Sequence, residues 1–215
     1  REAAATLATL ADPTAIGVVV AWWRDAPSAD RMSALRTLLL GVARAEAGAE
    51  HDGRVREAVL GLGKTGAWDA ADGLSQELVA ETPRPLLQLA RAEVLLERGL
   101  LDGEVSARQG MLEEASALLE TLRTAEDAPD GLAHLAMRVL AASGVLAGTN
   151  EARTERYLKA VTIAVEDADE GEVTARLGLE VADRLQQEPL AALLTEADTA
   201  ALAEARRVLQ SRVGS

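Results

Sequence analysis

The sequence contains no cysteine and no phenylalanine, and aromatic residues make up only 2 % of it. The absence of cysteine excludes disulfide bonds, thiolate metal sites and cysteine nucleophiles. With so few aromatic residues, the core must consist of small aliphatic side chains, which suit close helix–helix contact better than a sheet. The longest apolar run, Ile16 to Trp23, is far shorter than a membrane span, and no segment has the pattern of a signal peptide.

Positive charge is scarce too, and the net charge is −13. Nucleic acids and anionic membrane surfaces require a basic footprint, so we expect neither as a partner. Lys64 and Lys159 are the only lysines, and we interpret this preference for arginine as that of a GC-rich bacterial genome. The chain begins at Arg1 rather than Met, and we expect it to be part of a larger cytoplasmic protein.

One motif of this sequence occurs twice. The pattern is G-[LV]-L-x-G-x-x-x-A-R, and its two copies, 45 positions apart, are Gly99–Arg108 and Gly144–Arg153. The same step maps Leu112 onto Tyr157 and Ala115 onto Ala160. A period of this length is typical of solenoids, whose units bury their apolar faces only against neighbouring units.

Apolar residues recur at helical spacing in several segments, and no segment alternates as a strand does. The clearest stripes lie in residues 111–122, 132–140 and 173–185. They predict an all-α fold of antiparallel helix pairs. We expect a single domain over residues 1–215, with N-terminal helices in 1–50 and repeat units at 51–85, 86–130, 131–175 and 176–215.

The segment Gly66-Ala67-Trp68-Asp69-Ala70-Ala71, followed by Pro83, resembles the second half of a tetratricopeptide repeat. In that family a glycine ends the first helix, an aromatic residue and a small alanine start the second, and a proline ends the unit. The resemblance implies a short right-handed α-solenoid whose first helices line a groove for a peptide or a domain. Repeat positions mapped onto that groove give five candidate contacts: Arg56, Lys64, Glu93, Glu97 and Arg138.

The next two units keep the glycine and the alanine at a longer spacing than the tetratricopeptide pattern. These are therefore either tetratricopeptide-like units with inserted linkers between their paired helices, at Leu100 to Gly110 and Val145 to Arg156, or units of another α-solenoid. Equivalent linkers of consecutive units should lie side by side on one edge of the stack. Gly103 and Gly148 would permit a tight turn in each linker.

Residues 58–65, A-V-L-G-L-G-K-T, fit a loose phosphate-loop pattern. Such a loop needs a buried strand before it and a helix after it, so that backbone N–H groups surround the phosphates. The preceding residues instead have a charged, helical pattern. The match to the pattern still leaves a nucleotide switch that uses Lys64 and Thr65 as an alternative to a binding module.

The remaining features of the sequence do not indicate a metal site or a catalytic site. The two histidines, His51 and His134, are far apart in the sequence and lack metal-ligand spacing, and no catalytic motif is found. We predict a non-enzymatic module with no catalytic residues, no metal and no cofactor, which binds a protein or a peptide. A purely structural dimerisation arm is a further alternative, with Trp22 and Trp23 as a docking feature.

Overall fold

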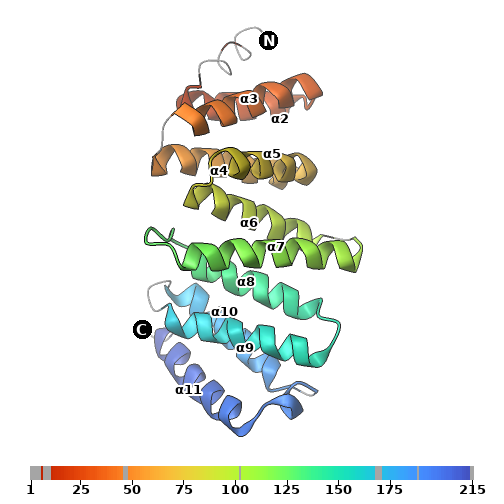
Figure 1. Ribbon diagram of the computed structural model, residues 1–215, viewed down its shortest axis with the longest axis vertical. Coiled ribbons are helices and arrows are strands. Elements are labelled where there is room, and N and C mark those ends of the chain that lie inside the picture. Colours follow the sequence, from red (N-terminus) through yellow and green to blue (C-terminus); the bar gives the residue numbers. More distant parts are fainter. Residues whose placement is uncertain are drawn as a thin grey trace. The chain divides into compact units, whose positions relative to one another are not determined.

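The computed structural model describes residues 6, 11–45, 48–101, 103–167, 171–187 and 189–213. These residues form ten α-helices, two 3-10 helices and no strand, which confirms the all-α class (Figure 1). The helices are η1 (Pro13–Ala15), α2 (Ile16–Asp25), α3 (Ala29–Ala45), α4 (Ala49–Lys64), α5 (Trp68–Glu81), α6 (Pro85–Leu100), α7 (Val105–Arg123), α8 (Leu132–Val145), α9 (Asn150–Glu166), α10 (Gly171–Leu185), η3 (Ala191–Leu193) and α11 (Glu196–Val213).

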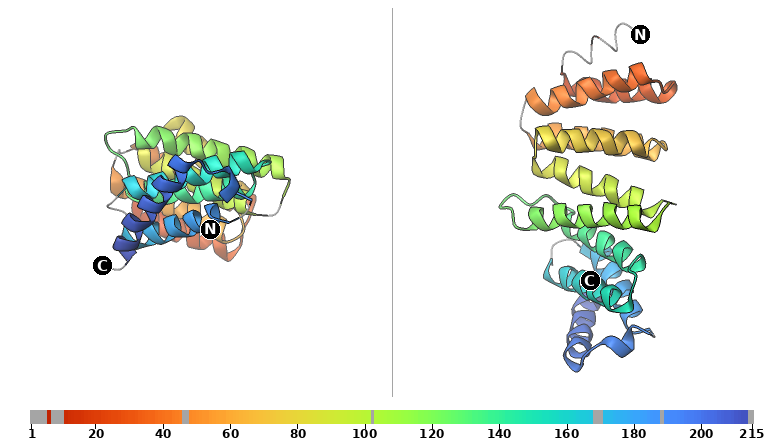
Figure 2. Two further views of the ribbon diagram at one scale, coloured as in Figure 1. Left: turned by 90° about the horizontal axis from the view of Figure 1, so that it is seen from below. Right: turned by 45° about the vertical axis from the view of Figure 1, so that its right-hand side comes forward.

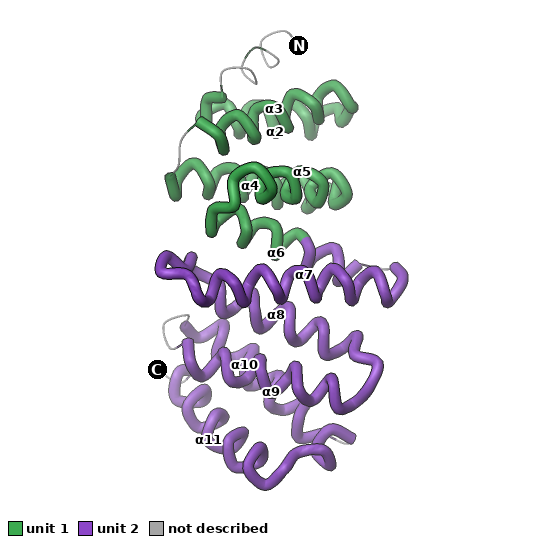
Figure 3. Tube along the Cα trace, in the orientation of Figure 1, with its two compact units in different colours: residues 1–94 green, residues 95–215 purple. Residues whose placement is uncertain are grey.

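The chain divides into two compact units, residues 1–94 and 95–215, and the division falls within α6 (Figure 3). In unit 1, α2 packs on α3 and α4, and both α3 and α4 pack on α5. Fully buried side chains, among them Leu35, Leu39 and Val59, fill the space between these helices. The aliphatic core expected from the composition is therefore present in this unit.

Unit 2 has the same packing order. Helix α8 packs on α7, α9 and α10, and α11 packs on α9 and α10. Consecutive helices run antiparallel, as Figure 2 shows for α8 and α9. Most of each stripe predicted in α7, α8 and α10 faces the interior, where Leu119, Val139 and Val181 are almost completely buried, but Val173, the first residue of the third stripe, is 66 % exposed.

The duplicated motif forms the same helix hairpin twice. Helix α6 ends at Leu100 and α7 begins at Val105, whereas α8 ends at Val145 and α9 begins at Asn150, again 45 positions later. Nε of Arg108 donates a hydrogen bond to the Gly99 carbonyl oxygen at 2.8 Å, and Nε of Arg153 donates one to the Gly144 carbonyl oxygen at 3.0 Å. In both copies of the motif, the arginine thus provides a hydrogen-bond donor for a carbonyl near the end of the first helix.

The predicted length of the linkers is wrong. Only residues 101–104 and 146–149 connect the paired helices, and the rest of each expected linker forms the first turns of α7 and α9. Neither Gly103 nor Gly148 has a positive φ, so neither residue adopts the left-handed backbone conformation that favours glycine. Both connections lie at the same end of the helices (Figure 2), and Nε2 of Gln109 donates to the Leu146 carbonyl oxygen at 2.5 Å.

A glycine in each hairpin accepts a large side chain of the second helix. A Cβ on Gly144 would overlap the ring of Tyr157, and one on Gly99 would lie 3.0 Å from Leu112. In unit 1 a Cβ on Gly63 would overlap the ring of Trp68. Close approach of the paired helices therefore depends on these glycines.

Substituting the motif arginine tests its contribution. We expect Arg153→Met to lower the free energy of unfolding by about 1 kcal/mol, because the Gly144 carbonyl loses a charge-assisted hydrogen bond. Urea denaturation followed by circular dichroism measures the loss. Arg207→Met is the control, since that side chain is 73 % exposed. Equal free energies of unfolding for the two variants would show that this hydrogen bond does not contribute to stability.

A buried carboxylate in unit 1 predicts a pH dependence. Asp52 is 5 % exposed, and its Oδ1 lies 2.9 Å from Nη2 of Arg84. Burial raises the pKa of Asp52, and the Arg84 charge opposes this only in part. The folded state then holds the proton more tightly than the unfolded state, so this group's contribution to stability falls as pH rises above the ordinary carboxyl pKa of about 4.

We expect Asp52→Asn to remove that contribution. The stability of Asp52→Asn relative to wild type should increase as the pH is raised from about 4 to about 7. Urea denaturation at several pH values measures the difference. Asp25→Asn, at the exposed end of α2, is the control for the change of residue type.

Candidate functional site

The five predicted groove residues divide between the two units. In unit 1, Arg56 of α4 forms an ion pair with Glu93 of α6, with Nη2 and Oε2 2.8 Å apart. In unit 2, Arg138 of α8 forms an ion pair with Glu97 of α6, with Nη2 and Oε1 2.7 Å apart. Lys64 lies at the exposed end of α4. The structure therefore brings four of the five residues together as two pairs.

These ion pairs join the first helices of successive helix pairs. The paired residues are 37 positions apart in unit 1 and 41 in unit 2, which is shorter than the 45-position step of the repeated motif. Second helices are joined in the same way, since Arg123 of α7 lies 3.1 Å from Glu166 of α9. Partly exposed ion pairs contribute at most about 1 kcal/mol each, so their main effect is on how neighbouring helices align.

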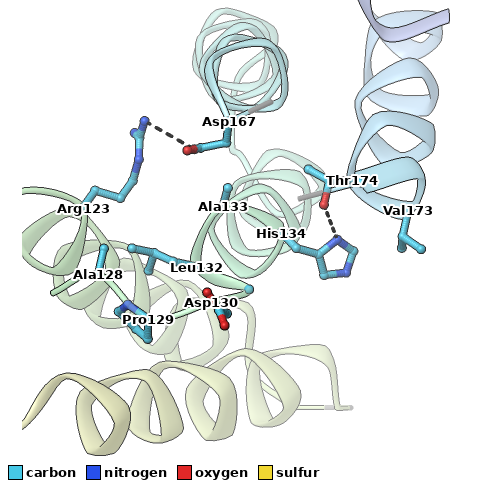
Figure 4. Close-up of a pocket in the computed structure, with 12 residues that line it drawn as sticks. Arg123, Ala128, Pro129, Asp130, Leu132, Ala133, His134, Asp167, Val173 and Thr174 are labelled. Carbon is cyan, nitrogen blue, oxygen red and sulfur yellow. Dashed lines mark hydrogen bonds and ion pairs between the residues drawn. The ribbon is translucent and has the colours of Figure 1, made fainter. Parts of the chain in front are cut away.

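A pocket of about 800 Å³ opens in unit 2 around the start of α8 (Figure 4). The end of α7, the loop after it and the start of α10 complete its wall. The lining residues are Arg123, Ala128, Pro129, Asp130, Gly131, Leu132, Ala133, His134, Asp167, Gly171, Val173 and Thr174. Leu132 and Ala133 are buried, whereas the Val173 side chain is exposed. The pocket thus combines buried apolar residues, which we call the apolar floor, with five polar or charged residues, namely Arg123, Asp130, His134, Asp167 and Thr174.

His134 connects two walls of the pocket. Its Nδ1 lies 3.4 Å from Oγ1 of Thr174, a buried residue of α10. His134 is one helical turn before Arg138 on α8, so both side chains lie on one face of that helix. The predicted groove residue Arg138 and the pocket therefore share the first-helix face of unit 2, which we define by Glu97, His134, Arg138 and Thr174.

Sequence reasoning missed the pocket because its shape comes from loop conformations. Gly131 and Gly171, which precede or begin α8 and α10, have φ values of +80° and +74°. Only glycine adopts this conformation without strain, so each residue sets the direction from which its helix starts. A glycine directly before an apolar stripe was the available signal. Among the described residues, no group of acidic residues, histidine or cysteine has an arrangement that could hold a metal ion.

The phosphate-loop-like segment has a different geometry from a phosphate loop. Residues 58–64 belong to α4, and Thr65 is the residue that ends this helix. The Thr65 hydroxyl donates to the Leu62 carbonyl oxygen at 2.7 Å. Backbone N–H groups within a helix are already bonded, so the segment does not present the open loop that surrounds phosphates.

The two adjacent tryptophans have different environments. Trp23 is buried in the core of unit 1, and the Arg31 guanidinium lies 4.7 Å from the ring centroid of Trp22. One face of the Trp22 ring is therefore in contact with a cation of the same unit.

Comparisons add no family to these observations. Neither a protein-family model nor a curated protein sequence matches this chain. Among the helices of the described residues, none combines the length and the apolar character that a membrane span needs.

Proposed function

We propose that the chain is a non-enzymatic protein-binding module. It is a short right-handed α-solenoid of tetratricopeptide-like helix pairs that holds a peptide on the first-helix face of unit 2. The observation that carries this proposal is the pocket around the start of α8, on the same helix face as Arg138. A concave pocket that combines apolar residues with polar groups can hold a ligand and fix its orientation. As part of a larger bacterial regulatory or signalling protein, the module would recruit a partner.

The repeated hairpin supports the solenoid part of the proposal. Helices α2 and α3 in unit 1, and α8 and α9 in unit 2, each pack on the next two helices, and polar contacts join like helices of successive pairs. Helix pairs arranged in this way present equivalent side chains on one face, which is how repeat proteins build extended binding surfaces.

Peptide selection tests the proposal. A random peptide library displayed on phage is panned against the intact chain, and the selected peptides are measured against two variants. Val173→Gln, in the pocket, should weaken binding about tenfold, because an apolar contact at the centre of an interface is lost. Val105→Gln is the control, since this valine is also exposed and lies near the start of α7, away from the pocket.

Two other results would favour the alternatives. Saturable binding of magnesium–ATP in calorimetry, abolished by Lys64→Ala, would support a nucleotide switch at residues 58–65. Light scattering would support a dimerisation arm if the molar mass of the wild type rose to twice that of the monomer with concentration and the Trp22→Ala variant remained a monomer. Selected peptides that bind both valine variants equally would exclude the pocket as the binding site.

A further inference from the structure

The loops at the mouth of the pocket are rich in carboxylates. The loop between α7 and α8 contains Glu126, Asp127 and Asp130. The described residues at the end of α9 and the start of α10 include Glu166, Asp167 and Glu172. The arginines nearest in these segments are Arg123, which pairs with Glu166, and Arg176, which pairs with Glu172. Of the residues that line the pocket itself, Asp130 and Asp167 carry negative charge and Arg123 carries positive charge, which leaves one net negative charge.

The charge and the apolar floor occupy different parts of the same pocket. Figure 4 shows Asp130 and Asp167 on two sides of the first turn of α8, with Leu132 and Ala133 between them in the view. Asp167 is 4.0 Å from Arg123, which is a loose ion pair, and its carboxylate can accept a second cation. A ligand that fits both parts has an apolar group for the floor and positive charge on either side of it.

We propose that the pocket binds a basic peptide segment, in which one apolar side chain enters the pocket and flanking arginines or lysines contact Asp130 and Asp167. This inference rests on the proposed function, because it names the ligand class of that same face. The net charge of −13 would also accelerate the approach of a basic partner. A peptide with acidic flanks would meet carboxylates of like charge at both positions.

Three fluorescein-labelled peptides test the charge and the apolar anchor separately. The first alternates arginine and leucine, the second has glutamate in place of each arginine, and the third has serine in place of each leucine. Fluorescence anisotropy measures their binding to the intact chain. We expect the first peptide to bind most tightly, and its binding to weaken as salt is raised, because screening reduces exposed charge pairs.

A pair of charge-neutralising variants locates the binding site. Asp130→Asn should weaken binding of the arginine–leucine peptide about threefold, as expected for one exposed charge pair. Glu151→Gln changes the net charge equally but lies in the first turn of α9, away from the pocket, and should leave binding unchanged.

The possible outcomes separate this inference from the proposed function. Equal weakening by both variants would mean that the general acidity of the chain attracts the peptide, and would overturn the inference. Tighter binding of the glutamate–leucine peptide, lost in Val173→Gln, would overturn the basic ligand class and leave the peptide-binding function intact. Failure of the arginine–leucine peptide to bind, while library-selected peptides do bind, would have the same meaning.

Discussion

Replacing Gly144 with alanine should lower the free energy of unfolding of unit 2 by about 3 kcal/mol. The added Cβ would overlap the ring of Tyr157, which is only 3 % exposed and has little space into which it can move. The paired helices α8 and α9 would have to separate, and the hydrogen bond from Arg153 to the Gly144 carbonyl would be strained. Urea denaturation followed by circular dichroism measures the loss.

Two other glycines provide matched controls for this substitution. Gly110 lies inside α7 with open space around its Cα, so Gly110→Ala should stabilise the helix by up to about 1 kcal/mol. Gly99→Ala should cost less than Gly144→Ala, because its Cβ would lie 3.0 Å from Leu112, whereas the Cβ at Gly144 would lie closer still to the Tyr157 ring and overlap it. If Gly144→Ala were as stable as Gly110→Ala, the close approach at this hairpin would not be needed.

The second large effect concerns the alanines that follow the repeated motif. Ala115 of α7 and Ala160 of α9 have equivalent positions in the repeat and are completely buried. Replacing either residue with leucine should cost about 2 to 3 kcal/mol, because the longer side chain overpacks a contact between helices. Thermal and urea denaturation of the two variants should give similar losses if the repeat alignment is correct.

An exposed alanine on the same helix controls for the change in residue type. Ala117 of α7 is exposed, and Ala117→Leu should change stability by no more than about 0.5 kcal/mol. Parent-like melting of both Ala115→Leu and Ala160→Leu would contradict the assignment of these positions as helix–helix contacts.

The helices and their pairing could be predicted from the sequence because both depend on local patterns. Apolar stripes at helical spacing gave the buried faces of α7, α8 and α10, and the repeated glycine and arginine identified the hairpin. The start of α7 could not be located. Residues 105–110 contain no strong helix signal, and the contact that holds them, from Arg108 to the Gly99 carbonyl, joins two helices.

The pocket could not be predicted from the sequence. Mapping of repeat positions gave Arg56, Glu93, Glu97 and Arg138, which form two ion pairs between first helices but do not line the pocket. The same mapping included Lys64, which lies at the exposed end of α4. The pocket depends on the backbone conformation of Gly131, and such a conformation is set by the contacts of the whole unit rather than by local sequence.

The distribution of the few aromatic residues gives unit 1 an optical signal of its own. Trp22, Trp23 and Trp68 all belong to unit 1, and the only tyrosine, Tyr157, lies in unit 2 against Gly144. Tryptophan emission therefore reports the unfolding of unit 1, whereas far-ultraviolet circular dichroism reports the loss of helix in both units. A single denaturation experiment with both signals can distinguish cooperative loss of the whole chain from stepwise loss of its halves.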